Sequence, residues 1–241
     1  MTRATMAELR HLRHRIARAA DAVISVQPPE GRVRARKVIS RSKGRCSGKF
    51  PSAKVGRMVE WEAPDELDAF KLLEADHKCL TYAEQPVVIR YRLDGKIHRH
   101  YPDIEVRTRQ GRELREIKTD RDAKRPEVQR RTALMTRDLP AFGYAYRLVS
   151  RSQLRSGPHL GNAKLLVKHG LEGVPPRDRE HLRSLFAAQG SITWGELVEG
   201  ALGPRALRQV SRLLLEGRLE LDPLQPINHR TAIRWAQRPQ E

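Results

Sequence analysis

Hydrophobic residues recur along this chain at two spacings, one typical of helices and the other of strands. Over residues 5–24 they return every three or four positions while Arg and His fill the opposite face, which predicts an amphipathic helix. The same spacing predicts helices over residues 64–76 and 126–140. Pro64 and Pro126 stand at their starts, and proline is favoured in the first helical turn.

Between these two helices, from residue 80 to residue 120, apolar and polar residues alternate as they do in half-buried strands. The alternation is interrupted at Asp94-Gly95 and at Gln110-Gly111, which are typical of hairpin turns. The segment therefore predicts a meander of three or four antiparallel strands, and residues 144–150 predict one further strand. This order of elements is typical of a mixed α/β core.

The last third of the chain has a different pattern. A Pro/Gly-rich boundary and a short apolar helix ending at Leu171 come first. We then expect three short helices and two strand-like pieces, over residues 178–189, 193–200, 204–216, 218–222 and 230–235. This order is typical of a winged helix-turn-helix, an α+β fold.

The third of these helices carries arginines on one face, at positions 205, 208 and 212 (Arg205, Arg208 and Arg212). A helix that reads a DNA groove has this character. An ordinary surface helix can also carry arginines on one face, and a winged fold that binds another protein fits the pattern nearly as well.

Composition limits the classes of protein to consider. No stretch approaches the roughly 18 apolar residues of a membrane span, and residues 1–20 lack the apolar core of a signal peptide, so we expect neither membrane insertion nor secretion. Cys46 and Cys79 are too few for a disulfide framework, which favours a reducing cytoplasm. Lys and Arg number 47 against 29 acids, a net charge of +18, so the expected partner is a polyanion.

The excess charge is concentrated near the N-terminus. Residues 1–60 hold 15 Lys and Arg against 4 acids, residues 61–150 hold 18 against 16, and residues 151–241 hold 14 against 9. A glycine- and serine-rich run contains most of the excess: Arg32, Arg34, Arg36, Lys37, Arg41, Lys43, Arg45 and Lys49. We interpret it as an arm that lies along DNA phosphates, although a solvated tail has the same composition.

We accordingly divide the chain into three parts: a basic N-terminal helix and arm (residues 1–55), an α/β domain (56–150) and a helical, winged-helix-like domain (151–241).

Two acids and a lysine in the strand region are candidate active-site residues. Asp103 follows Tyr101-Pro102 and is expected in the middle of a strand, while Glu116 and Lys118 fall on the strand that pairs with it. Since side chains alternate along a strand, Glu116 and Lys118 share a face and Ile117 points into the core. Two carboxylates about 4 Å apart repel by roughly 4 kcal/mol at an effective dielectric of about 20, so the pair calls for a cation.

Carboxylate ligands with positions left for water and phosphate describe a magnesium site, which Mn²⁺ also fits. With Lys118 on the same face, the arrangement suits metal-assisted hydrolysis of a phosphodiester. The helix over residues 64–76 offers a further acid, Glu66, with Glu62 as the alternative. A chance pairing of Asp with Glu-x-Lys as surface ion pairs remains the simpler interpretation of the bare pattern.

Other candidate ligands carry weaker signals. His98 and His100 alternate onto one face of the same strand as Asp103, where they either assist at a metal or line a polar sheet face; we favour the second. His77 and Cys79 make too sparse a set for a soft metal, so Cys79 is interpreted as a structural thiol.

Residues 56–150 resemble the catalytic domain of the TnsA family, the endonuclease subunits of heteromeric transposases in the PD-(D/E)xK nuclease superfamily. The resemblance is carried by the runs WEAPDELDAFKLLEAD, TYAEQPVVIRY, DGKIHRHYPDIEV and LREIKTD. It implies a restriction-endonuclease-like mixed sheet flanked by helices. It also implies catalytic residues Glu66, Asp103, Glu116 and Lys118, and a metal set of Glu66, Asp103, Glu116 and Ile117.

The resemblance further implies an activity and partners. The protein would nick the 5′ ends of a transposon with Mg²⁺ in the bacterial cytoplasm, at the nucleoid when assembled on DNA. A DDE-type transposase would cut the 3′ ends and an AAA+ ATPase would license the target. The family often has a serine near the start of the first helix, whereas this chain has Ala63-Pro64-Asp65-Glu66, which leaves Glu62 and Glu66 both open.

Two alternatives to this hypothesis stay open. One is a stand-alone nuclease of the same superfamily, such as a restriction or junction-resolving enzyme. The other is a non-catalytic DNA-binding scaffold, in which the acids of the strands form only ion pairs.

Overall fold

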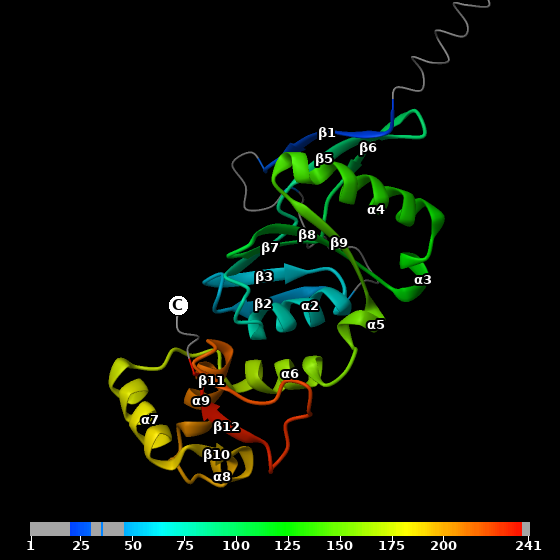
Figure 1. The fold of residues 1–241 in the computed structure, drawn as a ribbon. Coiled ribbons are helices and arrows are strands. Elements are labelled where there is room, and N and C mark those ends of the chain that lie inside the picture. Colours follow the sequence, from blue (N-terminus) through cyan, green and yellow to red (C-terminus); the bar gives the residue numbers. More distant parts are fainter. Residues whose placement is uncertain (1–19, 30–34, 36–45, 238–241) are drawn as a thin grey trace, which may run out of the picture.

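The computed structural model describes residues 20–29, 35 and 46–237 (Figure 1). Most of the helix expected over residues 5–24 and most of the basic arm lie outside this part of the chain. The arm residues concerned are Arg32, Arg34, Arg36, Lys37, Arg41, Lys43 and Arg45. Within the described residues, no helix is of a length and apolar character that would cross a bilayer.

The fold is mixed α/β, as the sequence predicts. Its first part runs β1 (Ala22–Gln27), β2 (Gly48–Ser52), β3 (Arg57–Trp61), α2 (Pro64–Ala75), β4 (Thr81–Glu84), β5 (Val88–Leu93), β6 (Lys96–His100), β7 (Ile104–Thr108), β8 (Gly111–Lys118), α3 (Asp120–Ala123), α4 (Pro126–Asp138), the 3₁₀ turn η1 (Leu139–Phe142) and β9 (Ala145–Ser150). The helices expected at 64–76 and 126–140 and the strand at 144–150 are thus present.

The central sheet has the strand order β4-β7-β8-β9. β7 pairs with β8 antiparallel through the predicted Gln110-Gly111 turn, with Ile104 opposite Arg115. β8 then pairs with β9 in parallel, which the intervening helices α3 and α4 allow. β8 therefore lies between two neighbours, and its C-terminal end is fixed on both sides.

A second sheet has the order β1-β5-β6, and β2 with β3 forms a separate hairpin. β5 and β6 are joined at Asp94-Gly95, where both residues have positive φ, as a tight hairpin turn requires. Residues 22–24 belong to β1, so the helix expected to continue to residue 24 is wrong at that end. Residues 48–52 form a strand rather than part of an arm.

The strand meander also differs from the prediction. The segment from Thr81 to Lys118 contains five strands shared between two sheets, because the chain leaves β6 for a different sheet after His100. Asp103 consequently lies in the connection just before β7, not in the middle of a strand.

Two hydrophobic clusters cover opposite faces of the central sheet. Phe70 and Leu73 of α2 pack with Ile117 of β8 on one face. Leu134 of α4 packs with Leu114 of β8 on the other, where β5 also contributes. Since the positions 114, 116 and 118 of a strand share a face, Glu116 and Lys118 point to the α4 side.

The second part of the chain begins at Arg151. In Figure 1, α2 lies between this part and the second sheet. This part runs α5 (Arg151–Leu154), α6 (His159–His169), α7 (Pro176–Gln189), β10 (Ser191–Thr193), α8 (Trp194–Val198), α9 (Ala206–Leu215), β11 (Leu219–Glu220) and β12 (Ala232–Trp235). The three predicted helices and both predicted strands are present. β10 is an addition, and it pairs with β12 in an antiparallel sheet of order β10-β12-β11.

Ion pairs join the two parts of the chain. Buried Asp65 in the first turn of α2 accepts hydrogen bonds from Arg151 Nε to both carboxylate oxygens, at 3.0 and 2.9 Å. Asp68, one turn later, pairs with Arg155 and with Lys164 of α6. Because α6 packs on both α2 and α9, this joint fixes the start of α2 against the C-terminal part.

Candidate active site

Asp103 is held at the end of the central sheet by the main chain of β8. Its Oδ2 accepts a hydrogen bond of 2.7 Å from the amide of Ile117. The β7–β8 register brings Ile104 opposite Arg115, so continuing it by one residue places Asp103 beside Glu116. The sequence therefore brought the correct pair of acids together, even though the position of Asp103 in the strand was wrong.

Lys118 lies among the oxygen atoms of these residues. Its Nζ is 2.6 Å from Glu116 Oε1 and 3.7 Å from Asp103 Oδ2, and it donates a 3.1 Å hydrogen bond to the carbonyl of Ile117. Ile117 itself packs into the core, as predicted, so only its main chain reaches the site. The ammonium group is thus surrounded by three oxygens from three residues.

Electrostatics in the site follow from burial and from this crowding of acids. Burial and the neighbouring Glu116 raise the pKa of Asp103 to about 7, although Lys118 and the Ile117 amide oppose the shift. For Lys118, burial acts to lower the pKa, but Asp103 and Glu116 outweigh it and hold the pKa above its ordinary value. Lys118 is therefore a cation at neutral pH, and it partly offsets the repulsion between the two acids.

Glu66 of α2 is the third acid. Its Oε2 accepts a 2.7 Å hydrogen bond from the amide of Glu62, so the side chain closes the first turn of its own helix. Burial, followed by the charge of Asp103, raises its pKa to about 8, which places Glu66 within the electrostatic reach of Asp103. Glu66 is one of the two acids that the sequence left open, and its first-turn position in α2 brings it near Asp103.

Arg131 and His100 contact the carboxylate of Glu116 on the α4 side, and Tyr146 contacts His100. Arg131 of α4 donates to Glu116 Oε1 at 3.3 Å. His100 Nε2 lies 3.3 Å from Glu116 Oε2 and 3.0 Å from the hydroxyl of Tyr146. Burial, with the nearby Arg131 and Lys118, holds the pKa of His100 well below its ordinary value, so a neutral imidazole faces Glu116.

Sequence reasoning missed Arg131 and left His100 as a lining residue. A signal for Arg131 existed, because it lies three residues after Val128 and four before Met135, both buried, and so falls on the inward face of α4. His98, the other histidine considered, stacks on Tyr91 with ring centroids 5.2 Å apart.

The acids do not form a complete metal cluster. Among the residues that the structure describes, no three His, Cys, Asp or Glu side chains are grouped so as to hold a metal ion. The expected set of Glu66, Asp103, Glu116 and Ile117 is thus only partly assembled, since Glu66 is turned to the amide of Glu62 and Lys118 lies between the others.

The donor set nevertheless fits magnesium. Glu116 Oε2 is buried and receives no hydrogen bond from the described residues, and the neutral imidazole of His100 lies 3.3 Å from it, while Oε1 is the oxygen that faces Lys118. The oxygens around Lys118 Nζ, two carboxylate and one carbonyl, are of the hard type that Mg²⁺ selects.

Two other expected features are not part of this site. Arg212 of α9 pairs with Glu216 at 2.6 Å and Arg208 lies 3.7 Å from Glu172, so of the three predicted groove-reading arginines only Arg205 has no ion pair within the described residues. Cys79 is buried and its Sγ donates to the carbonyl of Thr81, which agrees with a structural thiol.

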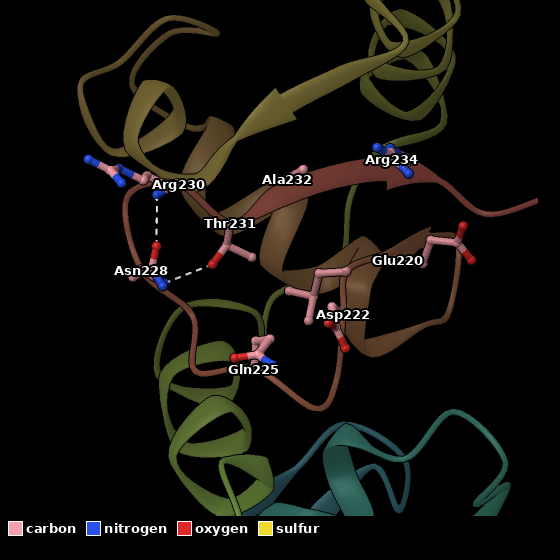
Figure 2. Close-up of a pocket in the computed structure, with 9 residues that line it drawn as sticks. Glu220, Asp222, Gln225, Asn228, Arg230, Thr231, Ala232 and Arg234 are labelled. Atoms are coloured by element: carbon pink, nitrogen blue, oxygen red, sulfur yellow. Dashed lines mark hydrogen bonds between the residues drawn. The ribbon is translucent and has the colours of Figure 1, made fainter.

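A shallow pocket of about 560 Å³ lies in the C-terminal part, remote from these acids. Figure 2 shows it along β12 and the loop before that strand, with Asn228, Arg230 and Thr231 at one end and Glu220 and Asp222 at the other. Its charges are mixed, and hydrogen bonds from the Asn228 amide to Thr231 and from the Arg230 amide to Asn228 hold the loop.

Comparison of the chain with models of protein families and with curated proteins finds no match.

Proposed function

We propose that the protein is a metal-dependent DNA endonuclease whose active site is formed by Asp103, Glu116 and Lys118. The observation that carries the proposal is the position of Lys118 Nζ, 2.6 Å from Glu116 Oε1 and 3.7 Å from Asp103 Oδ2, at the end of the central sheet. An ordinary pair of surface ion pairs would not place a partly buried Asp103 beside the buried Glu116; burial and then the charge of Glu116 raise the pKa of Asp103.

Asp103, Glu116 and the carbonyl of Ile117 would hold a Mg²⁺ or Mn²⁺ ion, with Glu66 as a further acid from α2. Such an ion supplies Lewis acidity at the scissile phosphate and lowers the pKa of a bound water. Glu116 is kept in place by Arg131 and Asp103 by the amide of Ile117, so the ligands are orientated before substrate arrives. Lys118 would keep its positive charge close to a phosphate held at these acids and would stabilise the negative charge of the transition state.

The fold supports the same class of enzyme. Three antiparallel strands followed by the parallel β9, with α2 and α4 on opposite faces, match what the resemblance to the PD-(D/E)xK superfamily implies for a restriction-endonuclease-like domain. The order α7-β10-α8-α9-β11-β12 is compatible with the winged helix that the sequence predicts. We further propose the role implied by the TnsA resemblance, which is cleavage at the 5′ ends of a transposon together with a DDE-type transposase and an AAA+ ATPase.

Strand-resolved cleavage tests the proposal. An end-labelled duplex that spans a transposon end is incubated with Mg²⁺ and the wild-type protein, with and without a DDE-type transposase and an AAA+ ATPase. Nicks confined to the 5′ strand that require the partners support the transposon role. Cutting by the protein alone supports a stand-alone nuclease, and DNA binding without cutting under either condition supports a scaffold.

A further inference from the structure

The second sheet has one face that is rich in arginine and open to solvent. Ile89 and Tyr91 of β5 point into the core, so Arg90 and Arg92 point to the opposite face. Arg99 of β6 is the register partner of Arg90 and therefore lies on the same side. We name Arg90, Arg92 and Arg99 the basic face.

The basic face is uncovered and unneutralised. Ile97, the register partner of Arg92, is 57% exposed, and Arg90 and Arg99 are exposed as well. Within the described part of the chain none of the three arginines has an ion pair or hydrogen bond. The nearby Asp94 is engaged by Arg130 at 3.2 Å.

Placing unneutralised arginines side by side on one sheet face lowers the stability of the folded protein. Like charges directly opposite each other on neighbouring strands destabilise a sheet, and Arg90 lies opposite Arg99. A polyanion removes that repulsion. We infer that the basic face binds the sugar-phosphate backbone of duplex DNA and extends the substrate contact of the nuclease beyond its cleavage site; this inference rests on the proposed function.

The spacing of these arginines favours DNA as the occupant. Residues two apart on a strand are about 6.8 Å apart, which is close to the separation of successive phosphates along one DNA strand, so Arg90 and Arg92 can contact neighbouring phosphates. Arg99 precedes Asp103 by four residues, at most about 14 Å of chain, whereas one turn of duplex spans about 34 Å. The basic face and Asp103 are therefore close along the chain but lie on different sides of β6, because His100 points to Glu116 and the neighbouring Arg99 points the opposite way.

The inference also changes which residues are expected to bind DNA. Arg212 and Arg208 of α9 are close to acids, whereas the three arginines of the sheet have no such neighbours among the described residues. Since a phosphate contact by an arginine carries no sequence information, the basic face adds affinity without adding base specificity.

Salt-dependent DNA binding by the full chain tests this inference. Binding of a fluorescent duplex is measured in EDTA, where no cleavage occurs, between about 50 and 200 mM salt. Removing three phosphate contacts is expected to make the slope of log K against log salt shallower by between about 2 and 3 in the triple variant R90A/R92A/R99A. The matched control is Arg109→Ala, an exposed arginine at the β7–β8 turn, the end of that hairpin remote from Asp103, and it is expected to keep the wild-type slope.

Each outcome decides between the hypotheses. A triple variant with the wild-type affinity and slope, and an unchanged melting temperature, overturns the inference, as does an equal loss in R109A. Loss of binding to an acidic polypeptide with unchanged binding to DNA overturns it in favour of a protein partner. The proposed nuclease is judged separately, because Asp103→Asn is expected to abolish cleavage while binding DNA with the wild-type slope.

Discussion

Lys118 Nζ and Glu116 Oε1 are 2.6 Å apart, and the same ammonium group also faces Asp103 and the carbonyl of Ile117. In the proposed function, a divalent ion would bind to these same oxygens. If a metal binds there, Lys118 must move aside, and its charge becomes available to the substrate. Metal and lysine then compete for one set of ligands, and this competition has measurable consequences.

Replacing Lys118 is expected to make the fold depend on divalent metal. In Lys118→Met the buried Glu116 loses its closest cation, and we expect the free energy of unfolding in EDTA to fall by about 1 to 3 kcal/mol, with Arg131 limiting the loss. Ca²⁺ should raise the melting temperature of this variant more than that of the wild type. Lys124→Met, at an exposed lysine just after α3, is the control. A variant that Ca²⁺ stabilises no more than wild type contradicts a shared ligand set.

The joint at the start of α2 is expected to contribute to stability. Asp65 is 5% exposed and receives hydrogen bonds from Arg151 and Arg155. Asp65→Ala leaves Arg151 without its carboxylate and Arg155 with Asp68 alone, so we expect a loss of about 2 kcal/mol in urea unfolding. Because Asp65 precedes Glu66, cleavage should fall further than stability alone explains. Glu180→Gln, which removes an exposed pair with Arg183, should leave the unfolding midpoint unchanged.

The close packing of α6 on α9 gives a test that uses two glycines of the same region. A Cβ at Gly170 would lie 2.8 Å from the backbone nitrogen of Arg212, whereas a Cβ at Gly161 has no atom within 4 Å. Gly170→Ala should therefore destabilise the protein, since the backbone of α9 must move. Gly161→Ala, inside α6, should stabilise it by up to about 1 kcal/mol through helix propensity. Equal effects of the two changes in thermal unfolding would contradict the α6–α9 packing.

A pH dependence is expected from Glu105 of β7. Burial acts to raise its pKa, but hydrogen bonds from Arg112 and Arg107 outweigh burial and hold the pKa below its ordinary value. A lowered pKa in the folded state means that the stabilisation is present above the unfolded pKa of about 4.3 and is lost as the pH falls through the folded value.

Comparing Glu105→Gln with wild type in urea at several pH values checks this. The difference in unfolding free energy should be about 1 kcal/mol near neutral pH, because both arginines are partly solvated, and should shrink below about pH 4. Glu127→Gln, an exposed acid at the start of α4, should show no such trend. A difference that is constant with pH would contradict the assignment.

The sequence predicted the elements whose signals are local. Pro64 and Pro126 begin helices, and Asp94-Gly95 and Gln110-Gly111 form turns, because the geometry of each depends on one or two residues. The pairing of Asp103 with Glu116 and Lys118 followed from one such turn. The mixed α/β class was also confirmed, because it follows from the order of these locally determined helices and strands.

Features that depend on contacts between distant segments were not predictable from these patterns. β1 forms because Ala22–Gln27 pairs with β5, which is more than sixty residues away. The chain changes sheets between His100 and Ile104, and this moved Asp103 out of its expected strand. The hydrogen bond from Arg131 to Glu116 likewise depends on the packing of α4 against the sheet. The sequence did place Arg131 on the same helical face as the apolar residues of α4.

The central claim is that Asp103 and Glu116 form a metal-dependent nuclease centre. Its most direct test is the rate of Mg²⁺-dependent cleavage of a labelled duplex by wild type, Asp103→Asn and the control Glu113→Gln, with the transposase and ATPase present. Loss of a metal ligand is expected to lower the rate by a factor on the order of 10³ or more in Asp103→Asn, with folding and DNA binding unchanged, and Glu113→Gln should cut like wild type. Cleavage by Asp103→Asn at the wild-type rate would contradict the account.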